Sequence, residues 1–425
     1  MLETIKNAWK VKELRNKILF TILIIVIFRI GSVIPVPYID VEMLRSSNTT
    51  NEFFNYLSIL TGGGLEYGAI FAMSVTPYIN ASIIIQLLCV AIPYLERLSK
   101  EGEEGQKKLA SITRYATVVL ALIQGVAFFL YLNGNGYLTV RGGFATVFAA
   151  IVIVLAFTAG SALVMWLGEQ IDVKGIGNGI SMLLFAGILS RGPQAFRVLL
   201  NNAKEHPIAV ILIVLLFVVI IGFIVWMTHA ERRIPVQYAK RVVGNKMYGG
   251  QNTHIPIKVN MAGVMPIIFA SSILMLPTMI LGFTNTTREN LSSLQKGLAL
   301  FSTQGVFYAV IYFILIIAFA YFYATIQFNP VEMANNLRKN GGSVPGIRPG
   351  KPTSDFISKI LSRITLMGAL FLSVIAILPI IVGNLGGINI SLGGTSVLIM
   401  VGVALDTVQN LESQMMMRHY KGFLD

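Results

Sequence analysis

The chain has 425 residues, of which 55% are hydrophobic and 12% are charged, and its net charge is +13. Soluble globular domains carry about 25% charged residues, so this chain has too little charge to cover a soluble surface. Its composition and its single cysteine, Cys89, exclude a soluble enzyme, a disordered chain and a disulfide scaffold.

Apolar runs long enough to cross a bilayer follow one another along the chain. A transmembrane helix needs about 20 mostly apolar residues, and stretches without Asp, Glu, Lys or Arg mark the candidates. The first run contains Arg29 and is interpreted as a retained span, because no small-residue cleavage site follows it. The last run is long enough for two helices, separated by Pro379 and the glycine-rich stretch 383–394. The sequence therefore predicts an all-α polytopic membrane protein with ten transmembrane helices, at about 18–35, 67–95, 115–140, 142–168, 175–190, 206–230, 259–287, 297–331 and twice within 364–405.

The segment after the first span is expected to return into the membrane from the outer side. Apolar residues at 53–60 precede three glycines at 62–64 and a stretch at 65–74 that is too short to span. Irregular backbone at membrane depth must be buried in protein or line water. We expect a re-entrant half-helix here, and the alternative is a helix that lies on the outer surface.

Two motifs recur at corresponding places along the chain. The second and seventh spans share the pattern Pro-x-Ile-x-Ala-Ser, at 77–82 and 266–271, and the fifth and tenth follow glycine-rich turns. Five spans separate the members of each pair, and five is odd, so the two halves would cross the membrane in opposite directions. Chance is the alternative, because these residue types are common in apolar segments. The prediction is two inverted five-helix halves, at 1–200 and 201–425.

Apolar residues at helical spacing line the spans that carry these motifs. Val75 precedes Ile79 by four residues, and Ile180 and Leu184 repeat that spacing in the fifth span. Ile268 occupies the position of Ile79 in the seventh span. Apolar side chains that converge on a water path can gate it by dewetting, although ordinary helix packing produces the same pattern.

Two long loops, at about 229–260 and 329–363, each carry six Lys or Arg residues. The preference of cytoplasmic loops for positive charge and attraction to anionic lipid account for part of this excess. Topology alone needs only a few charges, and residues 341–350 are rich in turn formers that fix the backbone. These loops therefore predict a docking surface for protein or RNA, with lipid contact as the alternative.

The distribution of Lys and Arg predicts the orientation in the membrane. If the N-terminus is cytoplasmic, the inner segments hold 25 of these residues and the outer loops hold 7, while Arg29 lies within the first span. Cytoplasmic loops carry the positive excess. Both termini are therefore expected on the cytoplasmic side.

The class of function follows from the near-absence of charge inside the spans. Inverted repeats place a transport path at the seam between halves, and ion-coupled transporters need ionisable groups at mid-membrane depth. Only Arg29 is charged inside a span, where it either reaches the outer interface or borders a water-filled cavity. No zinc-protease, serine-hydrolase or nucleotide-binding motif occurs. A passive conduit driven by a partner is therefore favoured over a small-solute transporter and over a membrane-embedded enzyme.

Several strings of residues resemble the SecY family of protein-conducting channels, which includes Sec61-alpha. They are PYINASIIIQLL at 77–88, WLGEQIDVKGIGNGIS at 166–181, YAKR at 238–241, KVNMAGVMPIIF at 258–269, VPGIRPG at 344–350 and GGTS at 393–396. The resemblance covers nearly the whole chain and implies ten helices in two inverted halves that form a clam shell. It also implies a channel, without enzymatic activity or cofactor, that moves unfolded polypeptides across the bacterial plasma membrane and inserts membrane proteins into it.

The resemblance further implies roles for particular residues. The central hydrophobic constriction would consist of Val75, Ile79, Ile180, Leu184, Ile268 and Ile399. A plug that closes the outer funnel, at about 60–71, would include Leu60, Thr61, Gly62, Gly63, Gly64, Leu65, Ala69, Ile70 and Phe71. The lateral gate, through which signal sequences reach lipid, would include Asn80, Gln124, Ser272 and Leu276. The SecA motor ATPase or the ribosome would dock on Arg232, Arg233, Lys240, Arg241, Arg348 and Lys351, and the small subunits SecE and SecG would complete the channel.

Overall fold

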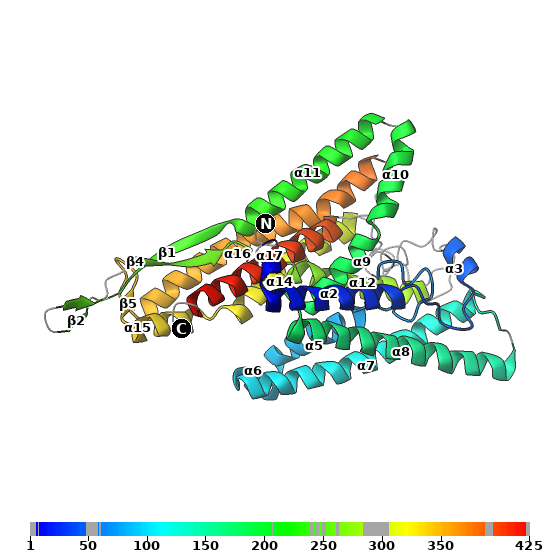
Figure 1. The fold of residues 1–425 in the computed structure, drawn as a ribbon, viewed down its shortest axis with the longest axis horizontal. Coiled ribbons are helices and arrows are strands. Elements are labelled where there is room, and N and C mark those ends of the chain that lie inside the picture. The colour runs from blue at the N-terminus through cyan, green and yellow to red at the C-terminus, as the bar shows by residue number, and fades with distance from the viewer. Residues whose placement is uncertain are drawn as a thin grey trace.

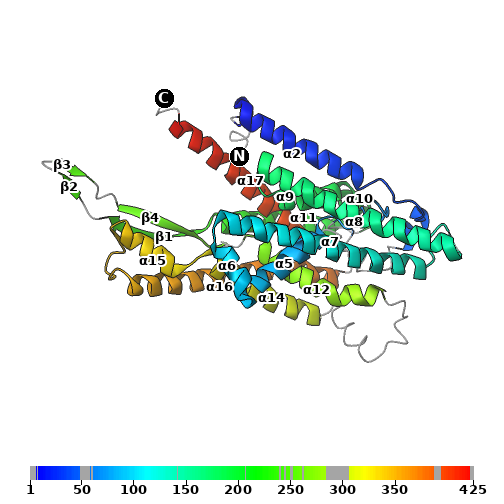
Figure 2. The same ribbon diagram turned by 90° about the horizontal axis from the view of Figure 1, so that it is seen from below.

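A computed structural model describes most of the chain. The described residues are 6, 8–47, 58, 61–140, 142–205, 207–238, 241–243, 246–248, 252–260, 263–283, 306–386 and 394–421. Long helices form an elongated body, and a group of strands projects from one end of it (Figures 1 and 2). Leu60 of the expected plug and Lys240 of the expected docking surface lie outside the described residues.

Helices make up the first part of the chain. They are α2 (Lys12–Gly31), α3 (Val41–Ser47), α5 (Thr76–Ala91), α6 (Pro93–Lys100), α7 (Glu103–Gly134), α8 (Gly143–Lys174), α9 (Gly179–Ser190) and α10 (Gly192–Glu205). Pro93 disfavours helical backbone at the residue before it, so α5 ends there and α6 leaves at a bend of 103°. Asn178 caps α9, because its side chain accepts a hydrogen bond from the backbone N–H of Ser181 at 3.0 Å.

The second part of the chain combines helices with strands. The helices are α11 (Pro207–His229), α12 (Met265–Phe283), α14 (Val306–Gln327), α15 (Pro330–Lys339), α16 (Lys351–Gly386) and α17 (Gly394–Lys421). The strands are β1 (Glu231–Tyr238), β2 (Arg241–Val243), β3 (Lys246–Tyr248), β4 (Asn252–Lys258) and β5 (Gly342–Ser343). An antiparallel sheet has the order β4-β1-β5, and β2 and β3 form a separate hairpin. The expectation of an all-α chain is therefore wrong for the two long loops, although the fold is mostly helical.

Several helices are suited to crossing a membrane. Among the described residues, five are long and apolar enough, and the bent pair α5–α6 makes a sixth if it is one span. The five are Glu103–Gly134, Gly143–Lys174, Val210–His229, Phe307–Lys339 and Lys351–Leu378. Helices α2, α9, α12 and α17 overlap the other predicted spans. The chain is thus a multi-pass membrane protein.

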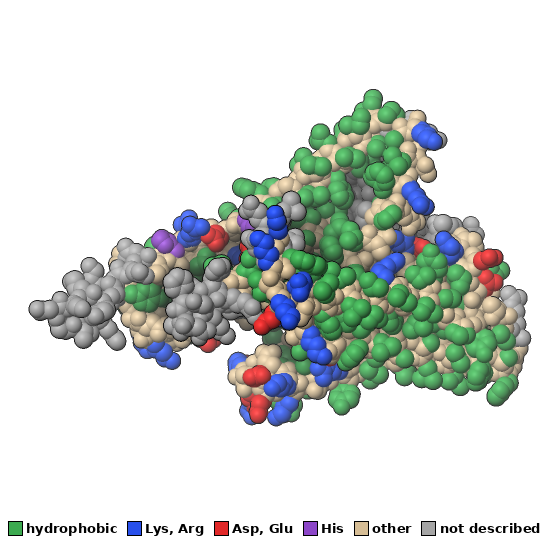
Figure 3. Space-filling view, viewed as in Figure 1, with side chains coloured by type: hydrophobic (Ala, Val, Ile, Leu, Met, Phe, Trp, Pro, Cys, Tyr) green, Lys and Arg blue, Asp and Glu red, His purple; other side chains and the backbone are tan. Residues whose placement is uncertain are grey.

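The surface of the helical body confirms what the composition indicated. Hydrophobic side chains cover much of it between two borders where charged side chains gather (Figure 3). On α11, Ile208 is 81% exposed and Trp226 is 66% exposed. Soluble monomers rarely expose apolar patches of this extent. The surface is therefore one that requires lipid or other membrane helices around it.

The helices pack mainly within the first part (α2–α10) or within the second part (α11–α17). Contacts between the parts run from α12 to α5 and α7, from α17 to α9, and between the consecutive helices α10 and α11. Helix α10 leads directly from α9 to α11, and the expected boundary between residues 200 and 201 falls inside it. The start of α2 also meets the last part of α17, where Lys17 Nζ donates to Gln414 Oε1 at 3.0 Å.

Candidate functional site

Six apolar residues from four places in the chain share one extended hydrophobic core, to which both parts of the protein contribute. Val75, Ile79, Leu184, Ile268 and Ile399 belong to one buried hydrophobic cluster, and Ile180 packs against it. We call these six residues the ring residues. The backbone N–H of Ile79 donates to the carbonyl of Val75 at 3.0 Å, so the expected spacing of one helical turn is present. All six therefore belong to the same extended apolar core, including Ile399, which only the family resemblance had indicated; that they form a ring stays a prediction.

A polar hollow adjoins the ring residues. It has a volume of about 270 Å³ and lies between the first residues of α9 and the middle of α17. Ser181 in its wall follows Ile180, and Val403 in its wall lies one helical turn after Ile399. The wall also contains Asn178, Asp406, Thr407, Gln409, Asn410 and Ser413. The apolar cluster is therefore bordered directly by space lined with hydrogen-bonding groups.

Residues 61–74, which we call the re-entrant segment, are mostly buried between the helices, but they do not form the expected half-helix. Of the apolar stretch 53–60 before them, only Ser58 is described. The segment consists of successive turns, in which the N–H of Ala69 bonds the carbonyl of Gly64 at 2.9 Å. Gly62, Gly63 and Gly68 have φ values of +65°, +91° and +53°. A right-handed helix requires negative φ, so these glycines break the helix. Burial of residues 61–65 also contradicts the alternative of a helix on the outer surface.

Two glycines of neighbouring helices let the re-entrant segment approach closely. A Cβ atom on Gly31 of α2 would lie 2.1 Å from the ring of Phe71, and one on Gly160 of α8 would lie 2.0 Å from the carbonyl oxygen of Ile70. Phe71 stacks on Phe28 of α2, with 6.1 Å between the ring centroids. The segment therefore fits closely against α2 and α8, and its residues join both the central cluster and a second cluster formed with α3, α7 and α8.

Charged side chains also hold the re-entrant segment. Arg29 Nη1 donates to the carbonyl oxygen of Gly62 at 2.8 Å. Arg191, at the end of α9, forms an ion pair with Glu66 at 2.5 Å and donates a hydrogen bond to Ser58. The side chain of Arg191 is 8% exposed and that of Glu66 is 23% exposed. Sequence analysis missed Glu66 and Arg191, although an acidic residue in a segment expected to enter the membrane signals a cationic partner.

The expected gate residues lie on the helices through which the two parts touch. Asn80 is on α5, Gln124 on α7 and Ser272 on α12, and α12 contacts both other helices. Gln124 and Ser272 are each 8% exposed. The backbone of Leu276 continues α12, and its side chain lies outside the described part of the structure. This seam combines apolar packing with buried polar side chains, which distinguishes it from the lipid-facing surfaces.

The two basic loops fold into one unit, which we call the basal module. It comprises β1, β4, β5, α15 and the start of α16, and it has its own hydrophobic core. The side chains of Arg232, Arg233, Arg348 and Lys351 are exposed on it. Arg241 belongs to strand β2, and only its backbone is described. Figure 1 shows that the strands extend beyond the helical body. Residues more than 100 positions apart in the sequence therefore share one exposed basic surface.

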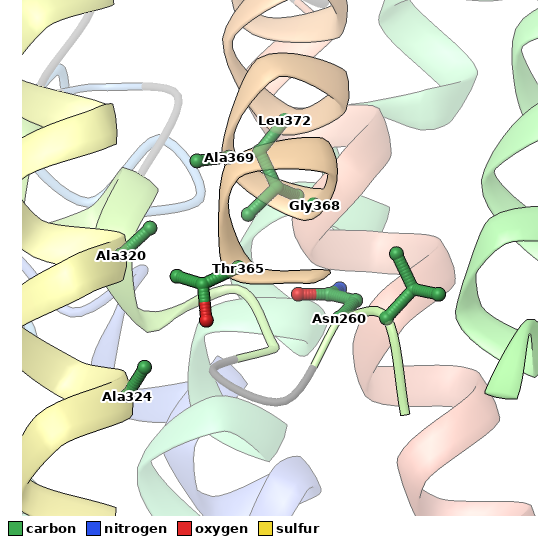
Figure 4. Close-up of a pocket in the computed structure, with 8 residues that line it drawn as sticks. Asn260, Ala320, Ala324, Thr365, Gly368, Ala369 and Leu372 are labelled. Carbon is green, nitrogen blue, oxygen red and sulfur yellow. The ribbon is translucent and has the colours of Figure 1, made fainter. Parts of the chain in front are cut away.

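The basal module is fixed to the helices by the residues that follow β4. A Cβ atom on Gly368 of α16 would lie 2.5 Å from the carbonyl oxygen of Val259, so glycine is required there. Asn260 and Thr365 face a cavity of about 10 Å³ between this strand end, α14 and α16 (Figure 4). Lys258 Nζ donates to Gln409 Oε1 of α17 at 2.6 Å. The module is therefore in direct contact with α16 and α17.

In the described part of the chain, no group of three or more His, Cys, Asp or Glu side chains could hold a metal ion. The site is built from apolar, glycine and arginine residues. A family model named SecY matches residues 69–408, which is most of the chain. The chain belongs to the SecY family.

Full-length relatives and solved structures support the same assignment. The chain is 42% identical over 438 residues to the protein translocase subunit SecY of Streptomyces coelicolor, and 44% identical over 437 residues to that of Bacillus subtilis strain 168; both alignments cover the whole of each chain. A solved protein-conducting channel has a similar fold, with a TM-score of 0.64 at 17% identity over 94% of this chain and 92% of that one. Sec61 in the canine ribosome-channel complex gives 0.62 at 18% identity with the same coverage.

Membership of the SecY family establishes the class of function. The chain is a subunit of a protein translocase that forms a protein-conducting channel, and it is not an enzyme. This confirms the preference for a conduit over an enzyme or a small-solute transporter. The ring residues, the re-entrant segment and the basal module are the features from which its mechanism has to be derived.

Proposed function

We propose that the six ring residues form the constriction through which this SecY chain passes unfolded polypeptides. The observation that carries this proposal is their convergence, from four separate places in the sequence, into one hydrophobic core to which both parts contribute. The adjoining polar hollow supplies a wet approach to that cluster. Apolar contact is non-directional, so such a ring seals around a moving chain of any sequence without holding it.

The proposed arrangement in the membrane has ten spans in two inverted halves, with both termini in the cytoplasm of a bacterial cell. The start of α2, the end of α17, α6 and the strands lie toward one end of the molecule, while α3 and α10 lie toward the other (Figure 1). The first group contains the segments with the excess of Lys and Arg, and such segments remain on the cytoplasmic side. The halves would meet at the ring residues and be connected on the outer side by α10.

We propose that the re-entrant segment is the plug of this channel and that the seam of α12 with α5 and α7 is its lateral gate. The segment is buried by close contacts to α2, α8 and α9. Buried Gln124 and Ser272 give the seam polar groups that can exchange partners. A signal sequence would enter between these helices, reach lipid and displace the segment.

The basal module is proposed as the docking surface for a motor or a ribosome. Its exposed arginines and lysines present positive charge on a folded base that is joined to α12, α16 and α17. The resemblance assigns the driving force to the SecA ATPase or to protein synthesis, and assigns two small membrane subunits, SecE and SecG. Two similar solved structures are ribosome complexes, one of canine Sec61 and one of yeast Ssh1.

A transport experiment tests this function. The chain is purified with its small subunits, placed in vesicles and supplied with SecA, ATP and an unfolded secretory protein. We expect ATP-dependent protection of that protein from external protease. Arg348→Glu should lower the rate to less than about a tenth of the parent, because charge reversal at a docking surface removes electrostatic attraction and adds repulsion. Lys204→Glu, on exposed α10, is the matched control and should retain transport.

Two outcomes would contradict the proposal. Saturable uptake of a small solute without any motor would indicate a solute transporter. Normal transport by a correctly folded Arg348→Glu variant would remove the basal module from the docking surface.

A further inference from the structure

We propose that Arg191 and Arg29 form a two-point latch that holds the re-entrant segment closed, and that Glu66 is the residue on which the latch chiefly acts. The proposal rests on the assignment of that segment as the channel's plug. The latch consists of three side chains, and neither the composition nor the motifs of the sequence indicated that these three act together. Each of them is described with its partners, and they come from three separate elements.

The latch contacts are strong and directional. Arg191 pairs with Glu66 at 2.5 Å, and Ser58 Oγ donates to the same carboxylate oxygen at 2.9 Å. Arg29 bonds the carbonyl of Gly62 at 2.8 Å, which Ser190 also contacts at 3.3 Å. Hydrogen bonds between ionised groups are shorter and stronger than neutral ones. The segment is therefore tied at two positions four residues apart, in addition to its apolar packing.

Burial makes the ion pair the stronger of the two contacts. The Arg191 side chain is 8% exposed, so water screens the pair weakly. Removing one member of a buried pair leaves an uncompensated charge and is far more disruptive than breaking an exposed pair. Arg29 bonds a neutral carbonyl, which remains able to bond Ser190. Loss of Arg29 should therefore loosen the segment less than loss of Arg191.

The two arginines lie against neighbouring glycines of the segment. A Cβ atom on Gly62 would lie 2.8 Å from Arg29 Nη1, and one on Gly63 would lie 3.7 Å from Arg191 Nε. Two positive charges thus lie against adjacent residues of the segment, and Glu66 pairs with one of them, Arg191. If the segment left, the arginines would repel each other without that carboxylate. This electrostatic cost opposes opening and favours return of the segment.

The position of Arg191 couples the latch to the connection between the two parts. Arg191 ends α9, and Gly192 begins α10, which leads to α11 of the second part. The N–H of Ala195 in α10 bonds the Arg191 carbonyl at 3.0 Å. A change in the angle between α9 and α10 therefore moves the Arg191 backbone and strains its contact with Glu66. Opening of the seam and release of the segment would then occur together.

Accessibility of a buried reporter tests the latch. Thr61→Cys is introduced into a Cys89→Ala chain, because Thr61 is 1% exposed and Cys89 is the only native cysteine. The full complex in intact cells is treated from outside with a membrane-impermeant maleimide. Glu66→Gln and Arg191→Gln should each raise the labelling rate by about tenfold or more. Arg29→Gln should raise it by about threefold, as expected for one hydrogen bond to a neutral group.

Three further variants separate a specific pair from general damage. Arg191→Lys keeps the charge and should label at a rate between the parent and Arg191→Gln. The charge swap Glu66→Arg with Arg191→Glu should label more slowly than either single neutral variant. Arg197→Gln alters an exposed arginine on α10 and should label like the parent. Labelling of the swap as fast as the single variants, or unchanged labelling of a folded Glu66→Gln variant, would overturn the latch.

The reporter needs no transport, so the two proposals fail separately. Faster labelling in a complex that does not translocate polypeptides would preserve the latch and contradict the proposed function. Normal ATP-dependent transport with unchanged labelling would contradict the latch and preserve the proposed function.

Discussion

The ring residues and the re-entrant segment are adjacent regions that are held by different forces. Apolar side chains alone meet at the ring, where packing and exclusion of water act without preferred direction. The segment adds an ion pair, a charged hydrogen bond and two close contacts at glycines. The difference teaches that a seal around a variable chain needs non-directional contact, whereas a closure that must return to one position needs directional contacts.

The largest effect is expected when the ring loses its apolar character. Replacing Ile79 and Ile268 together with serine removes two buried isoleucines, each worth about 2–5 kcal/mol of packing, and admits water to the constriction. The resting conductance of the complex in a planar bilayer should rise by about tenfold or more. An unchanged conductance would show that these residues do not form the seal.

The next largest rise in conductance is expected from a bulky side chain at Gly160, the glycine of α8 that lies against the re-entrant segment. Gly160→Val places a side chain where a Cβ alone would approach the Ile70 carbonyl to 2.0 Å, so the segment must move. We expect conductance to rise by about fivefold, less than in the ring variant, since the ring itself stays intact; overpacking of this kind costs about 1–3 kcal/mol. Gly222→Ala on α11 is the control, because its Cβ would meet no atom within 4 Å. Equal effects of the two variants on conductance would contradict the role of Gly160 in seating the re-entrant segment.

Removal of the weak contact between Ser190 and the re-entrant segment should loosen the segment less than the changes above. The single proton of the Ser190 hydroxyl is donated chiefly to the Gly187 carbonyl at 2.6 Å, so the 3.3 Å contact with the Gly62 carbonyl is weak. Ser190→Ala removes both contacts, and Arg29 still bonds the Gly62 carbonyl. Because a typical hydrogen bond contributes about 1 kcal/mol, labelling of the Thr61→Cys reporter should rise by no more than about threefold. A rise as large as that of Arg191→Gln would place the main anchor at Ser190 instead.

Salt should have the smallest effect. Exposed charges are screened over about 10 Å at 0.1 M salt, whereas buried pairs are screened much less. Labelling of the reporter should therefore change by less than about twofold between about 0.05 and 0.5 M sodium chloride. Strong acceleration by salt would show that water reaches the Arg191–Glu66 pair in the closed state.

Local pattern predicted the ring better than the re-entrant segment. The spacing of Val75 and Ile79, and of Ile180 and Leu184, follows from the helical period, and the structure retains it. Burial of the segment was also predictable from its apolar residues and lack of length. Its conformation was not, because the positive φ values of Gly62, Gly63 and Gly68 depend on what packs around them. Ile399 required the family resemblance, since no spacing relates it to the others.

The strands of the basal module were missed although a signal existed. Ile234 and Val236 are buried while Arg233 and Pro235 are exposed, which is the alternation of a half-buried strand. The expectation of docking loops rested on the number of basic residues, and a residue count does not reveal a period of two. The pairing of β1 with β5 joins two loops that lie about 100 residues apart, and only tertiary structure could supply that contact.

By itself, the sequence determined that this chain crosses a membrane many times and that its spans carry almost no charge, and it predicts that positive charge gathers on one side. These properties follow from residue type and short-range period, because water and lipid act on each segment in the same way. Only the tertiary structure decided which residues meet: the six ring residues, the two arginines on the re-entrant segment and the two loops of the basal module. Contacts between distant segments depend on how the helices pack together, and no local pattern records that packing.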